Sequence, residues 1–177
     1  MSGLLFLTAE DFVIQKGAKG NIMCHGIPGF SLILFYSTHC THCQTLIPIF
    51  KKLPGTIQGC QFGMINVSTN KKCIQMSKNT VAAISYVPYI VLHVNGRPFM
   101  VYKGPYDPNE IRRFVIEVAN SIQKKQQFHA KGKQTQQGPH GHKKSIPEYT
   151  VGIPIYGDGN ENVCYLDFVE AYPGKKR

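Results

Sequence analysis

The stretch that decides the fold is STHCTHC, residues 37–43. It contains two cysteines, Cys40 and Cys43, separated by two residues. The apolar run FSLILFY at 30–36 precedes it and predicts a buried strand, and residues 44–53 predict a helix with a kink at Pro48. A strand, a C-x-x-C pair and a helix in this order are typical of a thiol–disulfide site.

The two cysteines stand where the predicted helix begins, and this position affects their reactivity. Unpaired backbone N–H groups and the helix dipole favour negative charge there. A cysteine in such a place can titrate at roughly 3.5–7.5 instead of about 8.5. We therefore expect Cys40 to react as a thiolate.

Length, composition and charge bound the classes of protein to consider. The 177 residues, 42% of them hydrophobic, suit one domain of ordinary size plus an appendage. The formal net charge of +10 fits acidic partners but is not by itself a signature of nucleic-acid binding. The six cysteines do not indicate a disulfide-dense miniprotein, and only Cys40 and Cys43 have an informative spacing.

The N-terminal stretch and the hydropathy argue against secretion and membrane insertion. Residues 1–11 lack a basic region and hold a short apolar run followed by two acids, so they do not predict a secretory signal. No window approaches the roughly eighteen apolar residues of a membrane span. We expect a cytoplasmic protein, or one packaged in a virion that is assembled in the cytoplasm.

Other predicted strands and helices surround the C-x-x-C unit. Asn95-Gly96 is the strongest short hairpin signal, and DPNE at 107–110 has the residues that open a helix. Further strands are expected at 4–7, 61–67, 89–94 and 99–102, further helices at 8–15, 71–78 and 107–123, and a loop at 16–29 with an edge strand at 22–24.

Four features of residues 1–123 occur together and in order. They are FYS before CTHC, the proline at 48 in the predicted helix, Val87-Pro88 before the penultimate strand, and Asn95-Gly96 followed by Gly104. With these features, residues 1–123 resemble a thioredoxin-family domain, and CTHC is similar to the protein disulfide isomerase form of its motif. The resemblance implies an α/β, thioredoxin-like fold with a central mixed sheet flanked by helices, followed here by an extended C-terminal arm.

The resemblance also implies a role for each site residue. Cys40 matches the exposed nucleophile and Cys43 the buried resolving thiol, while His42 between them would stabilise the Cys40 thiolate. A cis Pro88 would leave the Val87 backbone free to pair with an extended substrate. The expected catalytic residues are Cys40, Cys43 and His42, and the expected substrate-binding residues are Val87, Pro88 and Tyr36.

The activity that the resemblance implies is thiol–disulfide exchange on protein cysteines, with the redox-active disulfide in place of a cofactor and without a metal. Two residues depart from the family pattern. His39 stands where a Trp is usual, and Leu34 where many members bury an acid, so we expect slow deprotonation of Cys43. Zinc is the alternative for the His and Cys residues at 39–43, but four ligands so close would strain a tetrahedral site.

The tail divides into two segments. Residues 124–144 contain six lysines and no acid, which predicts a basic linker that cannot form a core. Residues 145–177 carry apolar clusters too small for a domain, which predicts an extended docking arm for a protein partner or assembly. The scarcity of aromatic residues in the linker argues against specific nucleic-acid recognition.

A second function fits the tail and the missing acid. In this alternative the chain is a thioredoxin-fold structural component of a large assembly, such as a minor capsid protein of a virus, anchored by its C-terminal tail. An isomerase-like motif without a secretory signal would suit a large DNA virus that forms disulfides in the cytosol.

Overall fold

The computed structural model describes residues 3–131 and 152–154, with side chains described up to residue 124. Most of the predicted linker and docking arm therefore lies outside the described residues. Within the described part, no helix has the length and apolar character needed to cross a membrane.

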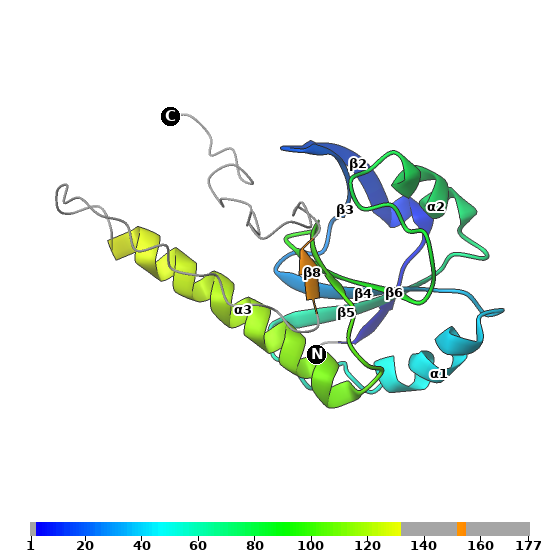
Figure 1. The fold of residues 1–177 in the computed structure, drawn as a ribbon. Helices are drawn as coiled ribbons and strands as arrows, with labels where there is room; N and C mark the ends of the chain where they lie inside the picture. Colours follow the sequence, from blue (N-terminus) through cyan, green and yellow to red (C-terminus); the bar gives the residue numbers. More distant parts are fainter. Residues whose placement is uncertain (1–2, 132–151, 155–177) are drawn as a thin grey trace.

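The core of the structure is a mixed sheet of six strands (Figure 1). The strands β1, β5 and β4 run parallel to one another, and β6, β7 and β8 continue the sheet in antiparallel pairs. In spatial order the strands are β1 (Leu4–Phe6), β5 (Cys60–Asn66), β4 (Phe30–Tyr36), β6 (Tyr89–Val94), β7 (Arg97–Tyr102) and β8 (Gly152–Pro154).

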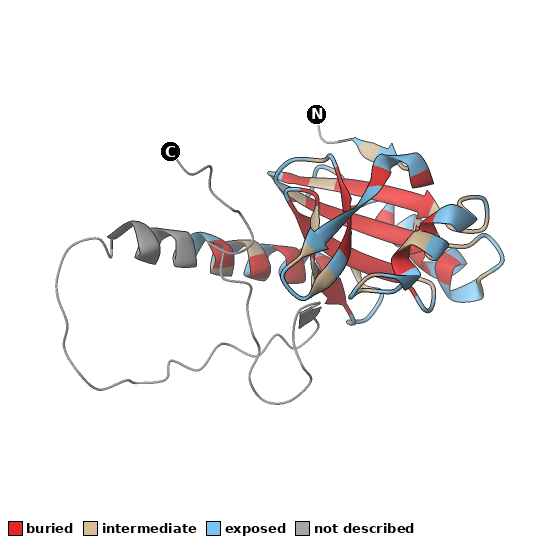
Figure 2. Cartoon of the chain, turned by 90° about the horizontal axis from the view of Figure 1, so that it is seen from above, coloured by how far each residue is buried: buried red, intermediate tan, exposed pale blue. Residues whose placement is uncertain are grey.

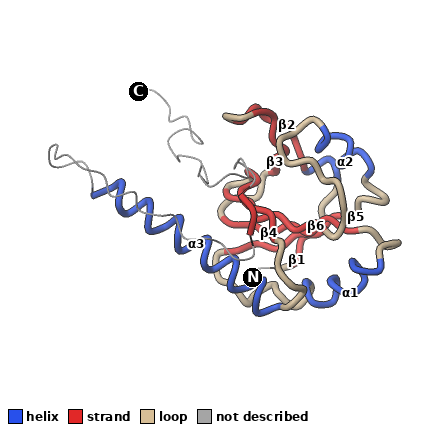
Figure 3. Tube along the Cα trace, viewed as in Figure 1, coloured by secondary structure: helices blue, strands red, loops and turns tan. Residues whose placement is uncertain are grey.

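The sheet is covered on both faces. Helices α1 (Thr41–Phe50) and α3 (Pro108–Lys131) lie on one side, and helix α2 (Lys71–Lys78) lies on the other with the hairpin of β2 (Phe12–Gly17) and β3 (Gly20–His25) (Figures 1 and 3). The expected thioredoxin-like α/β fold is thus confirmed.

The central strand β4 explains this layering. Leu32 and Leu34 pack into the core beneath α1 and α3, whereas Ile33 and Phe35 pack into the core beneath α2 and the hairpin. Because side chains alternate between the faces of a strand, a strand covered on both faces needs an unbroken apolar run. The buried residues accordingly follow the central strands (Figure 2).

The expected helix at 8–15 is wrong. Thr8 does form a capping box, in which its backbone N–H donates to Asp11 Oδ2 at 2.7 Å, but the box caps only one 3-10 turn, Ala9–Asp11. The chain then enters β2, which pairs with β3 from Phe12 to Gly17. Pairing with β3 outweighs the local capping signal, since the β-branched residues Val13 and Ile14 favour a strand.

The expected boundary after Gln123 also differs from the structure. Helix α3 continues to Lys131, so the first eight residues of the predicted linker are helical. Lys, Gln and Ala are good helix formers, and the helix ends directly before Gly132. Gly152–Pro154, expected within an arm that docks on a partner, pairs with Met100–Tyr102 of this chain's own sheet.

The Asn95-Gly96 turn joins β6 to β7 and also holds the β2–β3 hairpin against the sheet. Both residues have positive φ, 49° and 77°, as the tight hairpin turn requires. The His25 backbone N–H donates to the Gly96 carbonyl at 3.0 Å, and a Cβ on Gly96 would collide with the His25 carbonyl oxygen. Glycine is therefore needed for the φ angle and for the close approach.

Two buried histidines join the hairpin to the sheet at the same place. The rings of His25 in β3 and His93 in β6 lie 4.4 Å apart, centre to centre. His25 Nδ1 accepts from the Ile27 backbone N–H at 3.1 Å, and its Nε2 lies 3.3 Å from Ser31 Oγ. Burial lowers the pKa of His25 to about 4, although the Asp11 charge acts in the opposite direction. Burial, and then the neighbouring His25, hold the pKa of His93 well below its usual value.

These histidines predict an acid-sensitive fold. The unfolded chain takes up protons near pH 6.5 that the folded chain resists, so stability is complete above about pH 6.5 and falls as the pH drops toward 4. Each unit of pKa difference is worth about 1.4 kcal/mol, which makes the loss a few kcal/mol. Between pH 7 and pH 5, the thermal unfolding midpoint of His93→Leu should fall by less than that of the parent chain. Ser85→Ala changes an exposed residue without a titratable group and should keep the parent slope, and an equal slope in His93→Leu would contradict the prediction.

Candidate functional site

Cys40 lies directly before the first residue of α1, and the first turn of the helix contacts its sulfur. It is the N-cap residue, with extended φ and ψ of −98° and 118°, and its Sγ accepts a hydrogen bond from the Cys43 backbone N–H at 3.2 Å. The thiol is only partly exposed. The helix therefore offers this sulfur a backbone donor where its dipole favours negative charge.

Cys43 lies one turn further along α1 and is fully buried. Burial, a hydrogen bond to the Cys40 side chain and the charge of Cys40 all raise the pKa of the Cys43 thiol, outweighing a hydrogen bond from the Ser37 backbone. Both cysteines are free thiols. The pair thus consists of an accessible sulfur at the helix start and a protonated thiol behind it.

The loop before β6 provides the other side of the site. The Val87–Pro88 peptide bond is cis, and the Cys40 thiol donates to the Val87 carbonyl at 3.6 Å. Val87 and Pro88 are both partly exposed. The fold thereby brings together Cys40, Val87 and Pro88 from segments more than forty residues apart.

The other residues that the sequence singled out around the site are His42, His39 and Tyr36. His42 is exposed on the first turn of α1, and His39 is exposed before it. Tyr36 ends β4 and is half-buried, with its side chain packed against the core beneath α1 and α3. Its expected role in substrate binding stays a prediction.

Leu34 occupies the place where the resemblance led us to look for a buried acid. It is fully buried in the core on the α1 side and is paired with Met64 and Ile90 in the sheet. An aliphatic side chain cannot take a proton from Cys43. Across the described residues, no group of three or more His, Cys, Asp or Glu side chains is placed to hold a metal ion.

Three residues near the dithiol were missed by the sequence analysis. Tyr106, in the loop between β7 and α3, has its pKa raised by burial and by the charges of Cys43 and Cys40. Tyr86, directly before Val87, is exposed and carries the Lys103 ammonium 3.9 Å above its ring centre. The sequence held only a weak signal for these residues, because Tyr86 and Tyr106 are simply aromatic residues beside loops that contain Gly or Pro.

Comparison with known proteins identifies the family. The Thioredoxin family model matches residues 28–117, which include β4, the C-x-x-C helix and the Val87–Pro88 loop. The chain therefore belongs to the thioredoxin family.

The chain is also similar to a viral protein, to a plant protein and to a solved human structure. The "Uncharacterized protein 196R" of Invertebrate iridescent virus 6 is 36% identical over 98% of this chain and 96% of its own length, which supports an origin in a large DNA virus. The "Protein disulfide-isomerase like 2-2" of Arabidopsis thaliana is 28% identical over 54% of this chain and 21% of its own length. The crystal structure of human ERp44 superposes with a TM-score of 0.45 at 22% identity, covering 50% of this chain and 27% of that one.

The site geometry predicts which thiol reacts first. In a Cys164→Ser background, iodoacetamide at about pH 6 should label Cys40 before any other cysteine, because it is accessible and at a helix start. Cys24, Cys60 and Cys73 are internal controls, since all three are buried and burial raises the pKa of each thiol. Peptide mapping after brief labelling checks the order, and earlier labelling of Cys43 would refute it.

Proposed function

We propose that this protein is a thiol–disulfide oxidoreductase that acts on protein cysteines, with Cys40 as nucleophile and Cys43 as resolving thiol. The observation that carries the proposal is the position of Cys40 Sγ. It lies between a donor from the helix, the Cys43 N–H at 3.2 Å, and the Val87 carbonyl of the opposite loop at 3.6 Å. A substrate sulfur bonded to Cys40 would have the Val87 backbone beside it to orient an extended segment.

The reaction needs two exchange steps. The Cys40 thiolate attacks one sulfur of a substrate disulfide, so that a Cys40–substrate bond forms and the other substrate sulfur leaves as a thiolate. Cys43 then loses its proton and attacks Cys40 Sγ, which forms the Cys40–Cys43 disulfide and releases the second substrate sulfur. Two electrons pass from the dithiol to the substrate, and the reverse sequence oxidises a substrate dithiol.

The proton on Cys43 sets the rate of the second step in this scheme. The pKa of Cys43 is raised, and Leu34 cannot accept the proton. The first substrate thiolate to leave, or solvent, must therefore take it. His42, exposed on the first turn of α1, would favour the Cys40 thiolate in the first step.

The scheme predicts opposite behaviour for the two cysteine variants. Cys43→Ser should accumulate a mixed disulfide with insulin or another disulfide-bonded protein, because the second step cannot follow. Cys40→Ser should form no adduct, and neither variant should turn over in an insulin-reduction assay. Cys24→Ala, a buried thiol in β3, is the matched control and should retain activity. Turnover by Cys40→Ser would rule out the scheme.

A second role rests on the tail. The iridescent-virus relative matches 98% of this chain, so the similarity extends past the thioredoxin domain into the residues after 131. We propose that these residues attach the domain to an assembly such as a virus particle, as a minor capsid protein would be attached. The two roles are compatible, since one uses the dithiol and the other the tail.

Truncation after Lys131 separates the two roles. The shortened chain should stay folded and keep its Cys40 reactivity, because the buried core residues described within 3–124 are all retained and only the edge strand β8 is lost from the sheet. It should be lost from purified virus particles in which the full chain is detected by immunoblot. Incorporation equal to that of the full chain would exclude attachment by the tail, whereas unfolding would show that the tail belongs to the domain.

A further inference from the structure

The surface beside Cys40 carries an aromatic–cation pair of Tyr86 and Lys103, referred to here as the Tyr86–Lys103 pair. Tyr86 directly precedes Val87, whose carbonyl lies 3.6 Å from Cys40 Sγ. A protein segment that is joined to Cys40 and runs along the Val87 backbone toward Tyr86 meets this pair. The pair is therefore part of the surface that a substrate meets.

The pair is held in place although it is exposed. The Tyr86 ring packs edge-on against Tyr89, at 5.2 Å between centres and 79° between planes, and Tyr89 is buried in β6. Lys103 Nζ then lies 3.9 Å from the Tyr86 ring centre. A cation attracted to a ring face loses conformational freedom before any substrate arrives, so less freedom is lost when it binds one.

The ammonium group of Lys103 is available to an external carboxylate. The ion pairs Lys72–Glu10 and Arg113–Glu110 do not involve Lys103. Asp107, which follows in the same loop, accepts from the backbone N–H groups of Asn109 and Glu110 and so caps α3. The acids closest in sequence to Lys103 thus have other partners.

Other groups around the dithiol also favour a negatively charged substrate. Exposed His39 and His42 flank Cys40, and the formal charge of the whole chain is +10. Tyr106, on the loop that follows Lys103, is exposed and close enough for the charges of both thiols to raise its pKa, so its phenol stays protonated and can donate a hydrogen bond. Cations and hydrogen-bond donors on this surface suit a carboxylate.

We propose that the Tyr86–Lys103 pair selects protein substrates with an acidic residue next to the reactive cysteine. The inference rests on the proposed thiol–disulfide exchange and concerns which substrate enters it. The chemical step is unchanged: Cys40 attacks, the leaving sulfur departs as a thiolate, and no further oxidant or reductant is needed. Lys103 acts by binding the neighbouring carboxylate.

Three short peptides of otherwise identical sequence test the proposal, each with one cysteine joined by a disulfide to thionitrobenzoate. The residue before the cysteine is Asp, Ala or Lys. Release of thionitrobenzoate by the reduced full-length protein gives a second-order rate for each peptide. The Asp peptide should react about three- to fivefold faster than the Ala peptide, the size expected for an exposed ion pair, and the Lys peptide more slowly. Added salt should reduce the difference.

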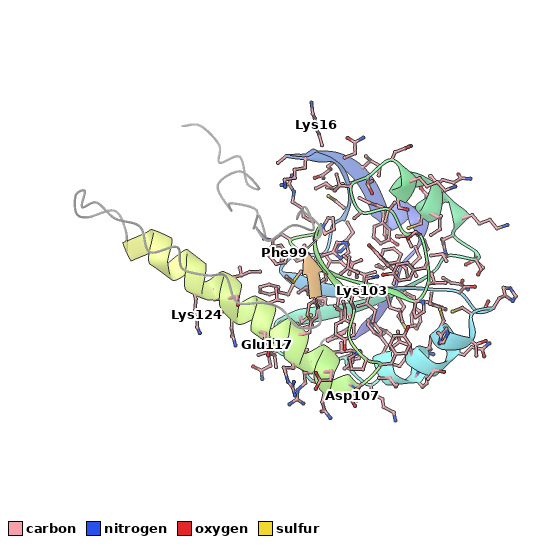
Figure 4. All side chains as sticks on the ribbon, in the orientation of Figure 1. Lys16, Phe99, Lys103, Asp107, Glu117 and Lys124 are labelled. Atoms are coloured by element: carbon pink, nitrogen blue, oxygen red, sulfur yellow. The ribbon has the colours of Figure 1, made fainter. Side chains whose placement is uncertain are left out.

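Two charge reversals identify the residue responsible. Lys103→Glu should invert the order of the Asp and Lys peptides, with each rate taken relative to the rate of the same variant for the Ala peptide. Lys16→Glu makes the same change in net charge on the β2–β3 hairpin, which lies away from Lys103 (Figure 4). It should keep the parent order. A thermal melt of each variant verifies folding.

The experiment distinguishes a failure of the proposed exchange function from a failure of substrate selection by the Tyr86–Lys103 pair. If the parent protein reacts with none of the peptides, the proposed exchange function is refuted, and the inference with it. If all three peptides react at equal rates in a Cys40-dependent way, the exchange function stands and substrate selection by the Tyr86–Lys103 pair is overturned. Equal effects of Lys103→Glu and Lys16→Glu would also overturn it, because net charge would then account for the preference.

Discussion

Burial of β4 on both faces is the constraint on which the rest of this structure depends. Leu32 and Leu34 face one core and Ile33 and Phe35 the other, and all four are essentially inaccessible to solvent. Each face must be covered, which requires α1 and α3 on one side and α2 with the β2–β3 hairpin on the other. Because β4 leads directly into the C-x-x-C loop, a strand that is buried on both faces positions Cys40.

The register of β4 with β6 then assembles the site. Phe35 pairs with Tyr89, so the chain that leaves β4 and the chain that enters β6 meet at one edge of the sheet. Cys40 comes from the first and Val87 from the second, and their 3.6 Å contact follows from this antiparallel pairing. A shift of one residue would reverse the faces of all β6 side chains, so the core and the site are specified together.

The electrostatics of the site differ from the family pattern because Leu34 stands where many members bury an acid. With Leu34 in the core beneath α1, no buried acid among residues 3–124 is available to receive the proton of Cys43, and burial raises the pKa of that thiol. The cation described near the site is instead at the surface, in Lys103. For the proposed exchange, this arrangement suits the binding of a negative protein segment better than fast deprotonation of Cys43.

Local signals were sufficient for much of the fold and for the centre of the site. The unbroken apolar run of β4, the C-x-x-C spacing, the Asn95-Gly96 turn and the DPNE helix start each depend on neighbouring residues only, so the sequence alone determined them. The tertiary structure decided the rest. Residues 12–17 became a strand because β3 lies beside them, and Tyr106 lies near the two cysteines, and Lys103 over Tyr86, because loops from distant parts of the chain converge there. Such contacts join residues far apart in the chain, and no local pattern encodes which loops the packed sheet brings together.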